Sequence, residues 1–487
     1  MPLPSLARPS SLIDPALMLL YFVASFAWVA WSTRRRAASA AAGEGERDAK
    51  LDYLLAGRRL TLPAFTLSMV ASWYGAVLGV GEYSFRYGLS NWLVFGVPYY
   101  LAAGLFAVFL AGRARKAQAL TLPEQIQKTY GPESGLMASG IVFFTSIPAA
   151  ELVALAILLQ VVLGLPFIAA MAAATAFTVL LIWRAGLRAV VRSHALQFVL
   201  MFGGFLFLLP MLVAEHGFLP FLTAHTPTEH WTWTGGRPLQ SVLVWYFIAL
   251  ATLVEPIFYQ RCFAARSPQV ARWGLFASIG CWIAFDFLTT FTGLYARALL
   301  TDLPAARAAE AYPILAQRFL PVGLCGLFFV SMTATVLSSL DSGLFVSATT
   351  LGRDFLGRTR RFESRIPRAT QLGLLLSALL AFALAWLSKS VVDLWHGLGS
   401  ISTATLLLPV LGAFIPRLRM SRRGAMANMA LVLSVTVVWL AALNVWDTAL
   451  LGIEPIFAGL GTGLLVWGVD RWLVRPTPTP EATLDPP

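Results

Sequence analysis

A short polar run stands inside an apolar block in the second half of the chain. Residues 338–342 read Ser-Ser-Leu-Asp-Ser. On a helix, Ser338, Asp341 and Ser342 share a face because residues three and four apart are neighbours, and Ser339 lies beside them. A membrane serine often bonds only the carbonyl one turn back. Several hydroxyl and carboxylate oxygens on adjacent turns exceed what packing needs, and a hard cation such as Na⁺ takes oxygen ligands.

Five acidic residues also fall inside apolar blocks, where a carboxylate costs about 2.5–3.5 kcal/mol on insertion scales. They are Glu82, Glu151, Glu255, Asp286 and Asp341. Each is either functional or paired to a neighbouring helix, and we favour pairing for Glu82 and Asp286. Glu151 and Glu255 differ, because each has within three residues a proline that interrupts helical hydrogen bonding and frees carbonyls.

Two blocks carry helix-breaking sequences at matching places. Residues 71–75 read Ala-Ser-Trp-Tyr-Gly, and residues 254–256 read Val-Glu-Pro. Five spans separate the starts of these two blocks, so the broken helices cross the membrane in opposite directions. Such a pair predicts an inverted repeat with a binding site at the midplane, where the broken segments meet.

The elements that position these residues are membrane helices. Of the 487 residues, 58% are hydrophobic and only 12% are charged, against roughly 25% charged in an average soluble protein. The apolar residues form about 13 blocks long enough to cross a bilayer, from residues 12–32 to residues 452–470. This composition excludes a water-soluble globule, and the three scattered cysteines indicate neither a disulfide framework nor a zinc site.

Basic residues gather in the connections on one side of the predicted spans. This bias accounts for the net charge of +12 without a nucleic-acid partner, and it places the N-terminus outside and the C-terminus in the cytoplasm. The odd number of predicted spans agrees with this, because it puts the two termini on opposite sides of the membrane. We therefore expect a multi-pass protein of the cytoplasmic (inner) membrane, with the lipid bilayer and a small-molecule solute as partners, that functions as a monomer.

Taken in order, the motifs resemble those of the sodium:solute symporter family, from about Leu51 to Arg475. They are Leu-Leu-Ala-Gly-Arg at 54–58, Ala-Ser-Trp-Tyr-Gly at 71–75, the segment from Pro256 to Arg261, and Ser-Ser-Leu-Asp-Ser at 338–342 leading to Arg-Asp-Phe at 353–355. The choline transporter branch is most similar in motif, with proline and pantothenate symporters as relatives. The resemblance implies an all-α membrane protein with a LeuT-like five-plus-five inverted-repeat core.

The implied organisation has one extra helix before the core and two after it. The parts are an N-terminal helix and cytoplasmic loop (1–60), a first repeat of core helices 1–5 (61–215), a second repeat of core helices 6–10 (239–416), two C-terminal helices (424–474) and a disordered tail (475–487).

The resemblance further implies a sodium site between the first and eighth core helices, with Na⁺ as the coupling ion. Its ligands would be the backbone carbonyls of Ala71, Tyr74 and Thr335 and the hydroxyls of Ser338 and Ser339. The implied substrate site draws on the first, third, sixth and tenth core helices. Its residues would be Trp73, Gly75, Glu151, Glu255, Phe258, Trp395 and His396.

Two departures from the family pattern concern the solute and the ion. The chain has Ala154 and Glu255 where the choline branch would place further tryptophans, and a carboxylate at Glu255 favours an amine over an anion. A Trp face near carboxylates also attracts cations. His194 stands where the family often has an aspartate that serves a further sodium site or the exit path. His194 is either a coupling group or an interfacial histidine, and we favour the interfacial histidine. Asp341 is the second candidate for a coupling group.

We therefore expect a sodium-coupled secondary active symporter that imports a small polar organic solute such as an amine or an amino acid. One alternative is a proton-coupled carrier of the same fold that uses Glu151, Glu255 or His194. An integral-membrane enzyme is disfavoured, because the five histidines form no catalytic cluster. A sensor of this fold would need a signalling domain, for which the tail after Arg475 is too short.

Overall fold

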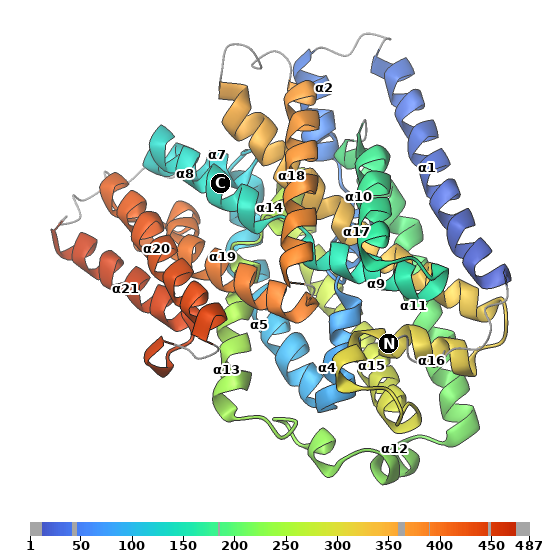
Figure 1. Ribbon diagram of the computed structural model, residues 1–487. Coiled ribbons are helices and arrows are strands. Elements are labelled where there is room, and N and C mark those ends of the chain that lie inside the picture. The colour runs from blue at the N-terminus through green and yellow to red at the C-terminus, as the bar shows by residue number, and fades with distance from the viewer. Residues whose placement is uncertain are drawn as a thin grey trace.

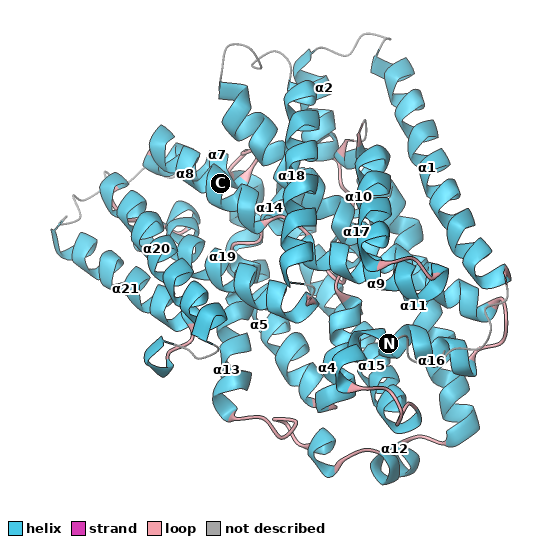
Figure 2. Ribbon diagram, in the orientation of Figure 1, coloured by secondary structure: helices cyan, strands magenta, loops and turns pink. Residues whose placement is uncertain are grey.

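The described part of the chain consists of helices joined by loops and turns (Figure 2). The computed structural model describes residues 12–40, 46–183, 186–358, 366–388, 390–446 and 450–473, so the predicted tail 475–487 lies outside the described residues. The helices up to the long central connection are α1 (Ile13–Ala40), α2 (Glu46–Leu55), α3 (Leu62–Ala71), α4 (Val77–Tyr87), α5 (Val97–Leu105), α6 (Ala111–Lys116), α7 (Leu122–Tyr130), α8 (Pro132–Thr145), α9 (Ala149–Leu163), α10 (Phe167–Ile182), α11 (Leu187–His216) and α12 (Leu219–His225).

The remaining helices carry the second predicted repeat and the two helices after it. They are α13 (Leu239–Ile248), α14 (Pro256–Ala264), α15 (Pro268–Leu299), α16 (Ala311–Phe319), α17 (Leu324–Thr349), α18 (Ile366–Ser388), α19 (Val391–Phe414), α20 (Arg422–Trp446) and α21 (Pro455–Leu473).

The helices occupy the predicted apolar blocks. Among the described residues, ten helical stretches are long and apolar enough to cross a membrane. The remaining three blocks hold the broken pair α3–α4, the shorter apolar helix α10 and the 19-residue α21. The predicted all-α membrane architecture is confirmed.

Both predicted helix breaks are present. Helix α3 ends at Ala71 and α4 begins at Val77, with non-helical backbone between them. Helix α13 continues as a 3₁₀ turn over Ala249–Leu253, and α14 begins at Pro256. Proline is tolerated in the first turn of a helix, because the backbone N–H that it lacks would have no hydrogen-bond partner within the helix there. A third interruption separates α8 from α9 around Pro148.

Helix α17 lies at the centre of the bundle, and the extra helices lie at its edges. In Figure 1, α1 runs along one edge and α20 and α21 lie at the opposite one. The buried share of the most apolar stretch of the helix is 89% for α17, 22% for α1 and 28% for α20. Small residues allow close packing of α17 on α11, because a Cβ added at Gly204 would overlap Ser331. The buried face of α17 therefore positions the site.

The edge helix α1 is tied to the centre through the N-terminus of α17. Asp14 Oδ1 accepts the backbone N–H of Gly323 (2.8 Å) and of Gly326 (2.9 Å). Gly323 is the N-cap of α17 and has no side chain that could cap its own helix. Asp14 thus supplies both the acceptor and the negative charge that a helix N-terminus favours.

We predict that Asp14→Ala lowers the free energy of unfolding by about 0.5–2 kcal/mol, the range for loss of an N-cap. Asp14→Asn should lower it less, because the amide oxygen still accepts a hydrogen bond. Thermal unfolding of the purified protein in detergent measures the effect, with the exposed Glu215→Ala as control. Equal melting temperatures for the wild type and Asp14→Ala would show that the cap does not stabilise α17.

Candidate ion and solute site

The unwound backbone after α3 lies against α17 through two serine hydroxyls. Ser338 Oγ lies 2.6 Å from the Ala71 carbonyl oxygen and 2.8 Å from that of Thr335, and Ser339 Oγ lies 3.3 Å from the Ala71 oxygen. Because α3 ends at Ala71, this carbonyl belongs to the helix-terminal groups that need partners outside the helix. All four residues are buried.

These oxygens fit a monovalent cation. The carbonyls of Ala71 and Thr335 and the hydroxyls of Ser338 and Ser339 are neutral oxygen donors, which are the ligands that a hard cation prefers. The structure thus brings together four of the five predicted sodium ligands. The fifth, the Tyr74 carbonyl, accepts the Val77 N–H at 3.1 Å, and its role as a ligand stays a prediction.

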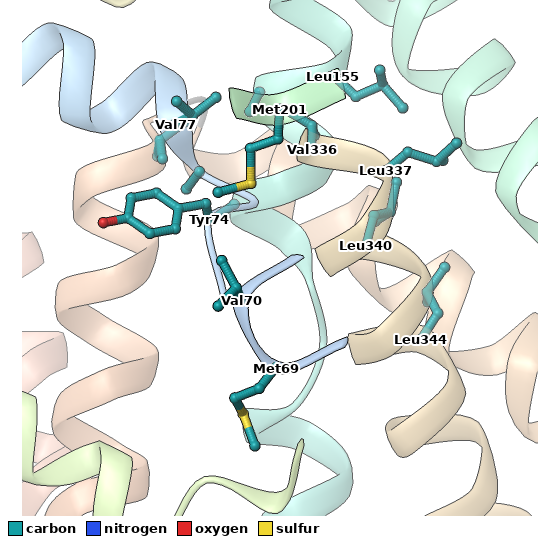
Figure 3. Packing of buried hydrophobic residues seen from close by; sticks show 14 of the residues in the cluster. Met69, Val70, Tyr74, Val77, Leu155, Met201, Val336, Leu337, Leu340 and Leu344 are labelled. Atoms are coloured by element: carbon teal, nitrogen blue, oxygen red, sulfur yellow. The ribbon is translucent and has the colours of Figure 1, made fainter. Parts of the chain in front are cut away.

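The ring of Tyr74 turns away from α17. Figure 3 shows it pointing away from Leu340 and Leu344. Its hydroxyl donates to Asp286 Oδ1 on α15, and the Tyr100 hydroxyl donates to Asp286 Oδ2. The unwound segment is therefore held by α17 on one side and by α15 on the other.

A cavity of about 180 Å³ lies beside the oxygen cluster, between the broken helices. Ser339 lines both the cluster and the cavity. Four of the seven predicted substrate residues also line it: Trp73, Glu151, Glu255 and Trp395. The predicted convergence of both helix breaks on one cavity is therefore present in the structure.

The other three predicted substrate residues lie around the cavity without lining it. Phe258 is buried behind Trp73, with the two ring centroids 5.0 Å apart and the rings nearly perpendicular. His396 is directed elsewhere, with Nε2 3.5 Å from a Glu454 carboxylate oxygen. Adjacent residues on a helix point in different directions, so Trp395 reaches the cavity and His396 does not. Gly75 packs so closely on Ser339 and Glu151 that a Cβ there would overlap both.

Three carboxyl groups reach the cavity wall: Glu151, Glu255 and Asp286. Glu255 is the N-cap of α14, and its Oε1 accepts the Ile257 N–H at 3.3 Å. Glu151 lies in the first turn of α9. The lining contains no lysine, arginine or histidine among the described residues. The cavity is therefore acidic.

Sequence reasoning missed Asp286 and most of the aromatic wall. We expected Asp286 to be paired to a neighbouring helix; it is, and it also lines the cavity. Tyr99, Tyr100 and Trp282 line the same cavity. The sequence does not indicate their place in the cavity wall, because aromatic residues are common in membrane blocks. Only the packing of the helices brings these three side chains to the cavity. Glu82 is paired within its own helix and not with a neighbouring one, because its carboxylate lies 3.1 Å from Arg86 four residues on.

His194 is not interfacial, and that prediction is wrong. The residue is fully buried, with Nδ1 3.0 Å from Ser68 Oγ and Nε2 3.5 Å from Ser342 Oγ. Helix α11 begins at Leu187 and carries His194 two turns into the bundle. A role of His194 in coupling stays a prediction.

Arg261 holds the same buried cluster together. Its guanidinium donates to Ser68 Oγ from Nε (3.0 Å), to Ser342 Oγ from Nη2 (2.9 Å), and to the Gln260 side chain. Ser342 in turn donates to the Ser338 carbonyl at 3.0 Å. The cluster thus links α3, α11, α14 and α17 one turn away from the oxygen cluster.

Asp341 lies apart from the cavity and from this cluster. It is buried, and its Oδ1 has no hydrogen-bond partner among the described residues. Ser338 and Ser342 share the face of α17 that meets α3 and α11, whereas no described contact brings Asp341 to either helix break. Its proposed coupling role stays a prediction.

Comparison with known proteins decides the family. The model of the sodium:solute symporter family matches residues 53–432. The chain belongs to the sodium:solute symporter family. This is a family of membrane transporters and not of enzymes, so the predicted class is confirmed, together with embedding in a membrane and a small-molecule solute.

The relatives of this chain differ in what their names say they carry. The chain is 27% identical over 394 residues to a sodium/myo-inositol cotransporter 2 of Mus musculus, covering 69% of this chain and 55% of that protein. It is 24% identical over 412 residues to a sodium/glucose cotransporter 4 of the same species, covering 72% and 56%. The chain thus spans about half the length of the curated relatives it matches.

Solved structures agree on the fold of this chain. A substrate-bound outward-open Na⁺-coupled sialic acid symporter superposes with a TM-score of 0.75, at 16% identity and covering 95% of this chain and 98% of that one. Mhp1, a nucleobase-cation-symport-1 family transporter, gives a TM-score of 0.55 at 14% identity, covering 86% and 94%. The fold is LeuT-like, as predicted.

We predict that Gly75→Ala weakens Na⁺ binding at least tenfold. The new Cβ would overlap Ser339 Cβ and lie 2.9 Å from Ser339 Oγ, so α17 and the unwound segment must move apart. The Na⁺ concentration that gives half-maximal thermal stabilisation measures the change. Gly104→Ala is the matched control, since a Cβ there meets nothing within 4 Å. If Gly75→Ala needs the same Na⁺ concentration as the wild type for half-maximal stabilisation, the close contact between Gly75 and Ser339 does not contribute to ion binding.

Proposed function

We propose that this protein is a sodium-coupled secondary active symporter that imports a small organic cation, an amine, across the cytoplasmic membrane. One observation carries the proposal: a cluster of neutral oxygens suited to Na⁺ shares Ser339 with a cavity whose described lining holds three carboxyls and no basic side chain. A zwitterion or an anion would find no positive partner for its carboxylate there. The names of the relatives do not bear on this choice of solute.

Coupling follows from the position of the ion in the unwound segment. Na⁺ bound to the Ala71 carbonyl would fix the backbone two residues before Trp73, which forms the cavity wall. It would also draw the two serines of α17 toward that backbone. Ion and solute then favour the same arrangement of α3 and α17, and a ligand shifts an equilibrium only by such differential affinity.

The Arg261 cluster supplies the barrier on one side of the site. With the proposed orientation, N-terminus outside, the start of α3 and the end of α14 lie toward the cytoplasm, and so does the cluster. Release of solute inward then requires the Arg261 contacts with Ser68 and Ser342 to separate. Inward movement of a positive charge gains about 2.3 kcal/mol per 100 mV of membrane potential.

A proton-coupled carrier remains the competing function, and the position of His194 does not favour it. His194 contacts Ser68 and Ser342 and lies outside the described cavity lining. A proton on it would therefore not touch the solute. The ion dependence of transport separates the two functions.

We predict that uptake of a labelled amine into proteoliposomes requires inward Na⁺ and stops when K⁺ replaces it. The double variant Ser338→Ala/Ser339→Ala loses both hydroxyl ligands and should need at least tenfold more Na⁺ for half-maximal uptake. Ser434→Ala is the control, because that hydroxyl bonds only a carbonyl of its own helix. Uptake that follows a pH gradient and ignores Na⁺ would refute sodium coupling.

A further inference from the structure

We infer that the solute carries two positive charges at the ends of a short hydrocarbon chain, as an α,ω-diamine does. This inference rests on the proposed function and names the class of amine. It follows from the number of carboxyl groups in the cavity, their hydrogen-bond partners and the helices from which they come.

The charge balance of the cavity indicates two positive charges on the solute. Glu151, Glu255 and Asp286 line the cavity, and the described lining contributes no positive side chain. With all three carboxyls ionised, one Na⁺ at the neighbouring oxygen cluster balances one of three negative charges. Uncompensated charge is costly in a site shielded from water. Two further positive charges on the solute bring the loaded site to neutrality.

Asp286 is already committed to the protein. Both of its oxygens accept tyrosine hydroxyls, from Tyr74 and from Tyr100. Tyr74 belongs to the same unwound segment as Ala71, so Asp286 braces the backbone that holds the ion. This carboxylate therefore belongs with Na⁺, and the two glutamates remain for the solute.

The two glutamates come from different helices. Glu151 stands at the start of α9, in the first predicted repeat, and its Cγ packs against Gly75. Glu255 stands at the start of α14, in the second. One Glu255 oxygen caps Ile257, and the other has no hydrogen-bond partner in the described structure. Both groups sit at helix N-termini, where the helix dipole favours negative charge. Two separate acceptors match two ammonium groups.

Aromatic side chains also line the cavity. Trp73 packs against Tyr99 and Trp282, with ring centroids 5.8 and 5.9 Å apart, and all three line the cavity. Such a surface suits methylene groups and attracts an ammonium over a ring face. Primary ammonium groups fit the carboxylates better than quaternary ones, because each offers three N–H donors.

The main alternative is a solute with one positive charge and one glutamate that keeps its proton. Three probes of equal chain length separate the two: 1,4-diaminobutane, butylamine and 4-aminobutanoate. We measure binding to the purified full-length protein in Na⁺ by thermal stabilisation and calorimetry. We expect the diamine to bind at least a hundredfold more tightly than butylamine, and the zwitterion not to bind.

The variant Glu255→Gln should reduce the diamine preference at least tenfold while changing butylamine affinity less than threefold. Glu82→Gln is the matched control, because Glu82 pairs with Arg86 and does not line the cavity. Equal affinities for butylamine and the diamine in the wild type would overturn the two-charge inference and leave sodium-coupled amine transport standing. Absence of any Na⁺-dependent amine binding would instead refute the proposed function.

A measurement on the wild type keeps the inference testable if Glu255→Gln does not fold. In proteoliposomes, the charge moved and the fluxes of labelled Na⁺ and labelled diamine are recorded together. We expect the charge moved to exceed the Na⁺ moved by two for each diamine. An excess of one would show that the site accepts only one positive charge of the solute.

Discussion

The site depends on a single carbonyl, that of Ala71. Inside a bilayer every backbone polar group needs a partner, so a helix that stops midway leaves oxygens that the surrounding protein must satisfy. Ser338 and Ser339 satisfy this one from the facing helix. The same hydroxyls are oxygen donors for a cation, so the requirement imposed by the membrane and the requirement of ion binding are met by one arrangement.

That arrangement also explains why α17 is buried along nearly its whole length. The oxygen cluster needs a rigid wall, and α17 is packed on several sides, by α11, α1, α18 and α9 among others. Glycine and serine at the α11 contact permit the approach. The edge helix α1 then stabilises α17 from its N-terminus through Asp14, which gives a helix outside the core a structural part in the site.

Sequence reasoning predicted the spans, both helix breaks and most of the ion cluster, because each leaves a local mark: an apolar run, a proline or glycine, a polar residue in an apolar block. It was least successful where orientation decides. In the sequence, Trp395 and His396 are equal candidates for the cavity lining. Only the rotation of α19 about its axis decides which of the two side chains reaches the cavity. Asp286 is paired with two tyrosines and also lines the cavity. Helix α11 begins well before His194 and places this residue inside the bundle, where we had expected the membrane interface.

The position of Arg261 bears on how ion and solute can leave together. A buried guanidinium with only neutral acceptors is costly on its own, and in the described structure its partners come from α3, α14 and α17 at once. Ser342 connects it to Ser338, which holds the ion carbonyl. Movement of α3 away from α17 therefore breaks the ion cluster and the Arg261 contacts in one step, so the two cannot open independently. A fixed positive charge one turn from the oxygen cluster would also lower the affinity of the opened site for Na⁺ and so favour its release.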